Sequence, residues 1–569
     1  MYYLALACDY DGTLAKDGVV SSKTIDALER FGASGRKLIL VTGRLLEDLQ
    51  QVFPRLDLFT YVVAENGALL YHPASSTEQL LGEAPPRQFL QALQERGVPL
   101  STGRVIVATW HPHETTVVDV IGKLGLERQV IFNKGAVMVL PTGVNKGTGL
   151  AVALREMKFS AHNIVGIGDA ENDHSFLSMC EFSVAVANAL PMLKEQADYT
   201  TKADHGDGVV ELIEQLLAYD LKTLDQRISR HALLLGTREQ NEKVFLNTHR
   251  TNVLVTGPSG SGKSTLIFAL LEQLVEQAYQ FCLIDPEGDY EAFQGAITLG
   301  DAHKEPGVTE VVELLEKSEH SAIINLLGTP LEDRPGFFRN LLPALLDLQT
   351  RLGHPHWLIL DEAHHLFPPE WDTSILQRTK DLFSMLFLSA HITHVSKQIL
   401  AIVDVVIGVG TDAPSTLRDF AQTAGQNVPE TVPSALEKGE ALVWFRRTEQ
   451  APVRIKPAQS KQEHQRHRRK YAEGDLGEDK NFYFRGPEGK LKLRAQNLAL
   501  FAQIAQGVDD ETWLFHLRKA DYSRWFREMI KDPDLAAEAE KVEKDEKLSA
   551  SESRARIVKA IEQRYTLPA

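Results

Sequence analysis

Two aspartates follow the first apolar run of the chain. Asp9 and Asp11 come directly after residues 4–8, which we expect to form a buried parallel strand. Parallel α/β sheets place their sites at the carboxyl ends of strands, so both carboxylates are expected at such an edge. Asp9 can attack a phosphoryl group while Asp11 handles the proton of the leaving group. The pair therefore predicts a site for phosphoryl transfer.

Later stretches supply the other groups that this chemistry needs. A second predicted strand ends in Thr42, whose hydroxyl can hold a phosphoryl oxygen, and Lys146 can neutralise developing charge. The apolar residues 164–167 lead to Asp169 and Asp173, oxygen ligands suited to Mg²⁺. Each stretch alone is also typical of a turn or a helix cap, but their order along the chain favours a single site.

This set of motifs resembles the haloacid dehalogenase (HAD) phosphatase superfamily, and residues 1–220 resemble its Cof-like, class IIB branch. The resemblance implies a Mg²⁺-dependent phosphatase that works through an aspartyl-phosphate on Asp9, with Asp11 as general acid/base. It further implies that Thr42 and Lys146 bind phosphate. The metal ligands that it implies are Asp9, the backbone carbonyl of Asp11, Asp169 and Asp173.

Residues 81–140 interrupt the phosphatase-like core, which is predicted over 1–80 and 141–220. The pattern predicts a helix over 87–96, a strand over 105–110, a helix over 114–124 and a strand over 130–140. This alternation looks like the α/β cap of the same HAD branch, which closes over a small substrate and excludes water. The resemblance therefore implies small phosphate monoesters as substrates, with sugar phosphates first.

A second phosphate site is predicted near the middle of the chain. An apolar run at 251–256, a glycine-rich loop and an apolar-periodic segment at 266–275 form the strand, loop and helix of a P-loop. Backbone N–H groups of the loop cradle phosphates, Lys263 reaches the terminal ones and Ser264 can bind Mg²⁺. The ATP-binding residues predicted here are Gly257, Pro258, Ser259, Gly260, Ser261, Gly262, Lys263, Ser264 and Thr265.

Asp361 and Glu362 end another apolar strand, residues 356–360. An aspartate in this place holds Mg²⁺ in P-loop enzymes, and the adjacent glutamate is placed to polarise an attacking water. His391 ends a further strand, where it serves either as a sensor of the γ-phosphate or as a buried structural histidine.

Residues 230–458 together resemble the HerA/FtsK group of RecA-like P-loop ATPases. The resemblance implies ATP hydrolysis in a homo-oligomeric ring, often a hexamer, with an arginine supplied by the neighbouring subunit. Arg418, Arg446 and Arg447 are the candidates for that arginine. Many members of the group move DNA, but the barrel domain of the HerA translocases is not recognisable here, which puts DNA translocation in doubt.

Residues 459–569 predict a small, mostly helical domain. Its aromatic residues are expected to form a core rather than a base-stacking surface; they are Trp513, Phe515, Tyr522, Trp525 and Phe526. A basic run at 461–470 is interpreted as a solvated linker, with a nucleic-acid or subunit contact as the alternative.

The composition is that of a globular protein: 569 residues, 43% hydrophobic and 24% charged. The formal charge of −16 argues against a protein whose whole surface binds nucleic acid. Three dispersed cysteines and the absence of a signal peptide or an apolar run long enough to span a membrane predict a cytoplasmic protein.

The sequence thus favours a phosphatase of small phosphorylated metabolites fused to an ATPase, with Mg²⁺ and ATP as cofactors and no membrane partner. The alternative is an ATP-driven nucleic-acid translocase, remodelling or defence protein whose HAD domain processes nucleotide or DNA-end phosphates. A kinase paired with a phosphatase is a third hypothesis, which Glu362 disfavours because it indicates water as the nucleophile.

Overall fold

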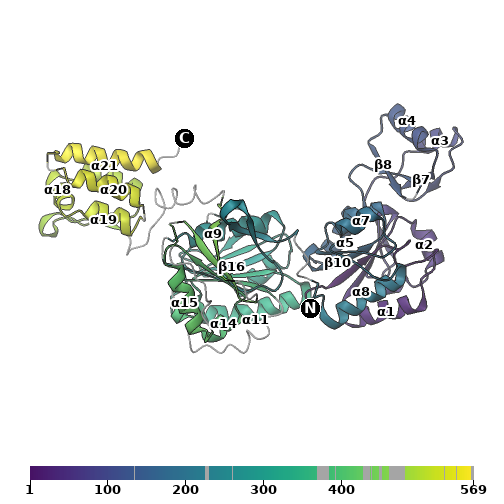
Figure 1. The fold of residues 1–569 in the computed structure, drawn as a ribbon. Helices are drawn as coiled ribbons and strands as arrows, with labels where there is room; N and C mark the ends of the chain where they lie inside the picture. The colour runs from purple at the N-terminus through teal and green to yellow at the C-terminus, as the bar shows by residue number, and fades with distance from the viewer. Residues whose placement is uncertain are drawn as a thin grey trace. The chain divides into compact units, whose positions relative to one another are not determined.

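Figure 1 shows the computed structural model of the chain. It describes residues 1–133, 135–224, 230–258, 261–291, 293–367, 383–390, 392–426, 436–437, 439–447, 451–460, 481–530, 532–545 and 547–565. The chain forms two compact units. The first unit comprises Met1–Gly257, Gln273–Glu291 and Gly295–Lys456, and the second comprises Pro258–Glu272, Ala292–Gln294 and Pro457–Ala569.

The first unit contains an eight-stranded sheet built from the N-terminal part of the chain. Its strands, in sheet order, are β12 (Tyr199–Thr200), β11 (Phe182–Ala185), β10 (Ile164–Gly168), β1 (Ala5–Cys8), β2 (Lys37–Val41), β3 (Tyr61–Ala64), β4 (Leu69–His72) and β5 (Thr77–Leu80). The central strand β1 pairs in parallel with β10 and β2, and every one of its residues is buried. The strand is apolar throughout because both faces of the sheet are covered here by other elements.

Helices flank this sheet: α1 (Ser22–Ala33), α2 (Leu46–Val52), α5 (Lys146–Glu156), α6 (His174–Leu177), α7 (Pro191–Gln196) and α8 (His205–Tyr219). Helix α1 begins where the Ser21 hydroxyl accepts a hydrogen bond from the Thr24 amide, an N-cap that satisfies one free backbone donor. Helices α1 and α8 lie side by side beneath β10 in Figure 1, with α5 above it. Helices thus cover both faces of the sheet, as in the α/β, Rossmann-like fold that the resemblance of residues 1–220 implies.

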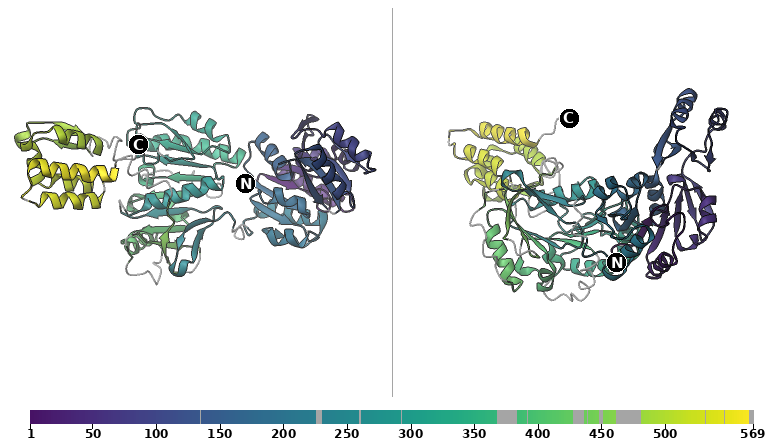
Figure 2. Two further views of the ribbon diagram at one scale, coloured as in Figure 1. Left: turned by 90° about the horizontal axis from the view of Figure 1, so that it is seen from above. Right: turned by 45° about the vertical axis from the view of Figure 1, so that its right-hand side comes forward.

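The inserted segment forms a separate lobe above this core (Figures 1 and 2). It contains α3 (Arg87–Gln94), α4 (Glu114–Leu124) and a sheet of four strands, in order β6 (Ser101–Thr102), β7 (Val107–Trp110), β9 (Ala136–Pro141) and β8 (Arg128–Asn133). The single strand predicted over 130–140 is wrong, because β8 and β9 pair as an antiparallel hairpin. Gly135 has φ 87° at the turn, a conformation that glycine adopts without strain.

A second sheet of the first unit carries the ATPase motifs. Its eleven strands, in sheet order, are β14 (Lys243–Leu246), β13 (Leu233–Thr237), β23 (Val453–Pro457), β22 (Ala441–Phe445), β21 (Val405–Val409), β15 (Val253–Thr256), β20 (Ser384–Ser389), β19 (Trp357–Leu360), β16 (Phe281–Asp285), β18 (Ala322–Asn325) and β17 (Ile297–Leu299). The helices between its strands include α10 (Val308–Leu315), α11 (Arg334–Leu352), α12 (Ala363–Leu366), α14 (Lys397–Ile402) and α15 (Ala413–Thr423). The P-loop helix is α9 (Lys263–Glu276), which starts in the second unit.

The C-terminal part of the second unit is mostly helical, as predicted. It contains a hairpin of β24 (Phe482–Phe484) and β25 (Leu493–Ala495), followed by α17 (Leu498–Gly507), α18 (Asp510–Arg518), α19 (Asp521–Glu528), α20 (Pro533–Glu543) and α21 (Ala550–Tyr565). The rings of Trp513 and Tyr522 stack with centroids 4.4 Å apart, and those of Trp525 and Phe501 stack at 5.1 Å. Phe526 is buried with them, whereas Phe515 is only half-buried, so four of the five predicted aromatics form the core.

The predicted basic linker, residues 461–470, lies outside the described residues. None of the helices in the described part of the chain has both the length and the apolar character needed to cross a bilayer.

Candidate active sites

The parallel register of the first sheet brings the predicted phosphatase residues to one edge. Cys8 lies opposite both Ile167 of β10 and Leu40 of β2, so the three strands end at nearly the same level. Asp9, Thr42 and Asp169 follow these ends and are all buried. The clustering that the sequence pattern implies is therefore a consequence of strand register.

Lys146 enters this cluster from the first residue of α5. Asn145 caps that helix: its side chain accepts from the Thr148 amide at 3.0 Å, and the Thr148 hydroxyl accepts from the Asn145 amide at 2.9 Å. This capping box fixes the start of the helix. The Lys146 ammonium then donates to Asp9 Oδ1 at 2.5 Å and to Asp173 Oδ1 at 2.6 Å.

Negative charge exceeds positive charge in the cluster. Oxygen atoms of Asp9, Asp169 and Asp173 lie within 4.8 Å of one another, and the Lys146 ammonium donates to two of these carboxylates. Burial, and then the charge of Asp173, raise the pKa of Asp9, although Lys146 acts in the opposite direction. Burial tends to lower the pKa of Lys146, but Asp173 and Asp9 outweigh it and the pKa is raised. Three carboxylates and one ammonium leave two formal negative charges, which fits a divalent cation with oxygen ligands.

Hydrogen bonds orient two of these carboxylates. Thr13 donates its hydroxyl to Asp169 Oδ1 at 3.1 Å. The backbone amides of Asp169 and Ala170 both donate to Asp173 Oδ2 at 2.9 Å, which leaves Asp173 Oδ1 to Lys146. Such partners fix the direction of potential metal ligands before any ion binds.

Arg44 holds the second aspartate of the motif. Its guanidinium donates from Nε to Asp11 Oδ2 at 2.7 Å and from Nη2 to Asp11 Oδ1 at 2.6 Å. This bidentate geometry positions a carboxylate more precisely than a single contact would. No role was predicted for Arg44 from the sequence. Its position two residues after Thr42 was the feature that could have placed it near the site. The Thr42 hydroxyl itself accepts from the Arg44 amide at 3.1 Å.

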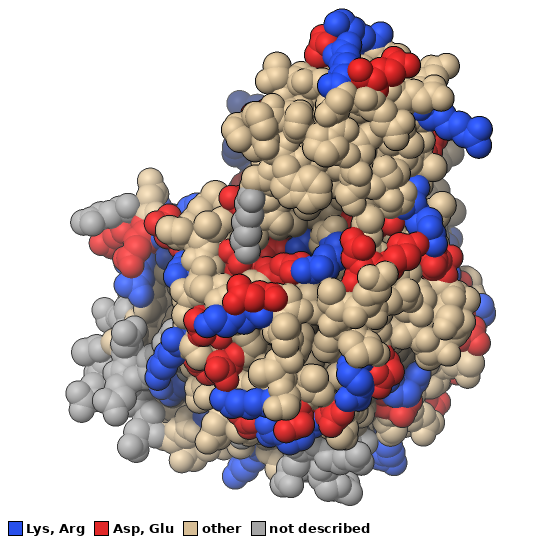
Figure 3. All heavy atoms as spheres, turned by 90° about the vertical axis from the view of Figure 1, so that its right-hand side faces the viewer, with Lys and Arg blue, Asp and Glu red and all other residues tan. Residues whose placement is uncertain are grey.

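A small cavity of about 140 Å³ opens onto these residues. Core residues Asp9, Asp11 and Lys146 line it together with Asn133 and Met138 of the inserted lobe. Figure 3 shows acidic and basic side chains gathered in the recess between lobe and core. The lobe residues that line the cavity were not identified from the sequence, because they belong to a hairpin whose pattern predicts one strand.

Glu65 of the core forms hydrogen bonds with the inserted lobe. Its buried carboxylate accepts hydrogen bonds from the backbone amides of Arg104 and Val105, each at 2.8 Å, and of Ile106 at 3.1 Å. A side chain at Gly103 would collide with this carboxylate, since an added Cβ would lie 2.5 Å from it. The hydrogen bonds to Glu65 hold the backbone at the point where β7 of the lobe begins.

In the ATPase sheet, Ile284 lies opposite Leu360, so Asp285 and Asp361 follow neighbouring strand ends. Burial, and then the charges of Asp285 and Glu362, raise the pKa of Asp361, so several carboxylates lie close together at these strand ends. Glu362 has φ 43°, a left-handed conformation that costs a non-glycine residue roughly 1–3 kcal/mol and is concentrated at functional sites. Its carboxylate lies 3.2 Å from His364 Nδ1.

The P-loop residues that the structure describes belong to the second unit, apart from Gly257. Lys263, Ser264 and Thr265 form the first turn of α9, as a P-loop requires. Gly262 has φ 104°, which only glycine adopts readily, and the Lys263 ammonium donates to the Pro258 carbonyl at 3.1 Å. Ser259, Gly260 and His391 lie outside the described residues.

Two of the three arginines that are candidates for supply to a neighbouring subunit form hydrogen bonds within their own chain. Arg446 donates to the carbonyls of Leu400 and Val403, and Arg447 Nε donates to Asp404 at 2.8 Å. Arg418 is exposed on α15. The Arg447 side chain is also 65% exposed, so both it and Arg418 lie at the surface of their own chain.

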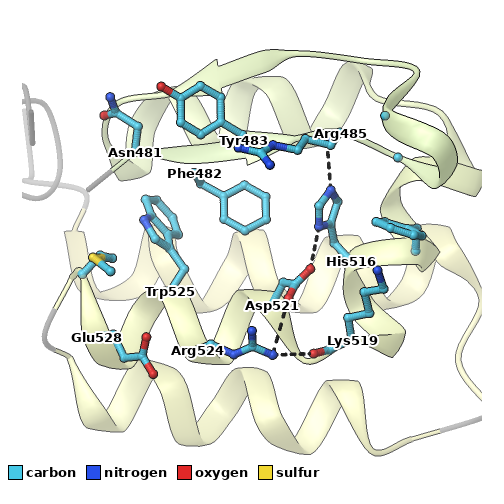
Figure 4. Close-up of a pocket in the computed structure, with 14 residues that line it drawn as sticks. Asn481, Phe482, Tyr483, Arg485, His516, Lys519, Asp521, Arg524, Trp525 and Glu528 are labelled. Atoms are coloured by element: carbon cyan, nitrogen blue, oxygen red, sulfur yellow. Dashed lines mark hydrogen bonds and ion pairs between the residues drawn. The ribbon is translucent and has the colours of Figure 1, made fainter. Parts of the chain in front are cut away.

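The helical domain has a pocket of its own, of about 510 Å³ (Figure 4). Arg485, Lys519 and Arg524 bring positive charge to it, and the Lys519 ammonium lies 3.9 Å from the centre of the Phe515 ring. His516 forms part of the pocket wall. Its Nε2 accepts a hydrogen bond from the Arg485 amide at 3.0 Å, and its Nδ1 lies 2.8 Å from Asp521 Oδ2. This pocket was not predicted from the sequence.

Comparisons with known proteins agree with both predicted domains. The model of the haloacid dehalogenase-like hydrolases matches residues 6–113 and 123–213, and a model of an AAA domain matches residues 246–401. A phosphoglycolate phosphatase of Methanothermobacter thermautotrophicus is 32% identical over 224 residues, which are 38% of this chain and 99% of that protein. Phosphoglycolate phosphatase 2 of Saccharolobus solfataricus is 27% identical over 224 residues, 38% of this chain and 93% of that protein.

Among solved structures, a haloacid dehalogenase-like hydrolase from Bacteroides thetaiotaomicron matches with 19% identity and a TM-score of 0.34, over 38% of this chain and 99% of that one. The match to the AAA model agrees with the predicted P-loop domain. Through its N-terminal part, the chain belongs to the haloacid dehalogenase-like hydrolases.

Proposed function

We propose that the N-terminal part of the chain hydrolyses a small phosphate monoester through an aspartyl-phosphate on Asp9, with Mg²⁺ as cofactor. The observation that carries the proposal is the buried group of Asp9, Lys146 and Asp173 beneath a cavity of about 140 Å³. The small volume supports a small substrate. Sugar phosphates are the class that the sequence favours, and the names of the curated relatives add phosphoglycolate.

In the proposed reaction a carboxylate oxygen of Asp9 forms a bond to phosphorus while the bond to the leaving oxygen breaks. Asp11 donates a proton to that leaving oxygen and later takes one from the water that cleaves the aspartyl-phosphate. Lys146 and Thr42 bind phosphoryl oxygens. Asp9, Asp169, Asp173 and the Asp11 carbonyl would hold Mg²⁺, which when bound supplies further neutralisation of the phosphate charge.

Phosphate release from a panel of sugar phosphates and phosphoglycolate, measured with Mg²⁺, tests the proposal. Release above background from at least one compound is expected. Background rates on the whole panel, unchanged by Asp9→Asn, would contradict it.

Arg44 is expected to act by positioning Asp11. Replacing Arg44 with Ala should lower kcat by roughly 10²-fold, because small displacements of a reacting group have costs of that order. Arg44→Lys should recover only part of the loss, since an ammonium cannot make both hydrogen bonds to the carboxylate. Steady-state kinetics of the two variants check this, and equal rates in Arg44→Ala and wild type would contradict it.

We also propose that the P-loop part hydrolyses ATP, with Asp361 on the metal side and Glu362 polarising the water. Glu362→Gln keeps the size of the side chain but removes the base, so ATP hydrolysis should fall by about 10²–10⁴-fold. Binding of a fluorescent ATP analogue should be retained. Glu310→Gln, on α10, is the matched control and should leave hydrolysis unchanged.

The nucleic-acid hypothesis remains the second candidate, favoured by the P-loop domain rather than by the phosphatase site. ATP hydrolysis that rises when DNA is added, with binding that weakens steeply as salt increases, would support it. A rate of ATP hydrolysis that does not change with DNA would favour a role confined to the small phosphate monoester.

A further inference from the structure

A second group of side chains that could hold a metal ion shares no residue with the predicted phosphatase and P-loop sites. It consists of His162, Glu181 and His231, and each offers one ligand atom within 4.8 Å of the others. Glu181 is fully buried and His162 nearly so. His162 and Glu181 belong to the phosphatase part of the first unit, whereas His231 immediately precedes its ATPase sheet.

Both ring nitrogens of His162 face oxygen atoms. Its Nε2 lies 2.7 Å from the Gln277 carbonyl oxygen, which can only accept, so Nε2 carries a proton. In the neutral ring Nδ1 then holds a lone pair, and this atom faces Glu181 Oε2. A lone pair facing a carboxylate oxygen is repulsive unless a cation lies between them or the ring is protonated. An N–H donated to a backbone carbonyl is the usual outer contact of a metal-bound histidine.

The carboxylate of Glu181 is held so that one oxygen is left for this purpose. Its Oε1 accepts from the Tyr279 hydroxyl at 2.7 Å and contacts His249 Nε2. Its Oε2 faces His162 Nδ1 and lies 3.7 Å from His231 Nε2. The two oxygens therefore have separate tasks, with Oε1 anchored and Oε2 directed at the two imidazoles.

His231 supplies the third ligand atom. Its Nε2 is buried and has no hydrogen-bond partner among the described residues. An unprotonated imidazole nitrogen in such a place can offer its lone pair to a cation. Three lone-pair donors thus converge on one point.

We propose that His162 Nδ1, Glu181 Oε2 and His231 Nε2 bind one Zn²⁺ ion. Two imidazoles and one carboxylate form a common zinc ligand set, and imidazole nitrogen disfavours Mg²⁺ and Ca²⁺. The separation of Oε2 and His231 Nε2 is that of neighbouring ligands around zinc, given bonds of about 2.0–2.2 Å. An ion between His162 and Glu181 would move those two side chains apart.

An ion at this site would link two parts of the first unit. The ion would join His231, at the start of the ATPase part, to two segments of the phosphatase core. The Arg230 guanidinium already donates to the Glu181 carbonyl at 3.0 Å and to Asp198 at 2.9 Å, so the backbone beside His231 is held at this place. The rival state is a metal-free network in which His162 is protonated and pairs with Glu181.

Zinc binding to the full chain distinguishes these two states. Zn²⁺ is titrated against a chromophoric chelator with millimolar Mg²⁺ present, which fills the phosphatase and P-loop sites. Wild type is expected to bind one equivalent. His231→Ala should weaken that binding by more than about 100-fold, since loss of an outer contact alone weakens metal binding by about 10–100-fold. Asp169→Asn is the matched control and should keep the equivalent.

No zinc retained by wild type, equal binding by His231→Ala, or loss of the ion in Asp169→Asn would each overturn the proposal. A measurement on wild type alone covers the case in which His231→Ala does not fold. Co²⁺ added in the presence of Mg²⁺ should give a visible d–d spectrum that Zn²⁺ abolishes. Failure to observe that spectrum would likewise overturn it.

Discussion

Asp9→Asn should reduce phosphate release by roughly 10³-fold or more, because removal of a catalytic nucleophile leaves only the effects of binding and charge stabilisation. The variant should fold, since the pKa of the buried Asp9 carboxyl is raised and an amide relieves its repulsion with Asp173. Circular dichroism and steady-state phosphate release check the two expectations.

Lys263→Ala is the paired control for that result. It removes the P-loop ammonium and should abolish ATP hydrolysis while phosphate release from the small substrate continues. Phosphatase activity lost in Lys263→Ala and retained in Asp9→Asn would place the measured release at the P-loop instead. Both variants therefore assign each activity to its own site.

Lys146→Met should destabilise the protein by about 3–5 kcal/mol, because it leaves buried carboxylates without their counter-ion. Lys146 is 1% exposed and contacts Asp9 and Asp173 directly. Chemical denaturation in the absence of Mg²⁺ measures the loss, and added Mg²⁺ should recover part of it. The loss should also shrink as pH falls, because acids whose folded pKa is raised bind more protons in the folded state than in the unfolded state.

Lys23→Met is the matched control for this prediction. Lys23 pairs with Asp207 at 2.7 Å, but the two side chains are 67% and 55% exposed. Exposed pairs contribute little, so the control should change stability by less than about 1 kcal/mol. Similar losses in both variants would show that the buried charges at Asp9 are not coupled to Lys146.

The sequence was sufficient to predict the strands that carry the motif residues and the clustering of those residues, and the reason is physical. Asp9, Thr42 and Asp169 each follow an apolar run, and parallel strands in register end together. Lys146 follows no such strand and was predicted from its motif and from the family resemblance. Their catalytic roles stay predictions.

What the sequence did not reveal depends on side-chain direction and on contacts between distant segments. The pairing of Arg44 with Asp11 requires two side chains to turn toward each other across neighbouring strand ends. The hairpin at Gly135 was missed because two apolar strands separated by a short turn have the pattern of one long strand. His162, Glu181 and His231 have no fixed spacing, so only the fold brings them together.

The most direct test of the account is to find the residue that becomes phosphorylated during turnover. The full chain is mixed with Mg²⁺ and a substrate that it hydrolyses, and the reaction is quenched with acid within one turnover. The protein is then digested and examined by mass spectrometry. We expect a phosphoryl group on the peptide that contains Asp9, absent in Asp9→Asn and removed by hydroxylamine. A phosphoryl group on any other residue, or none at all while substrate is consumed, would contradict the proposed mechanism.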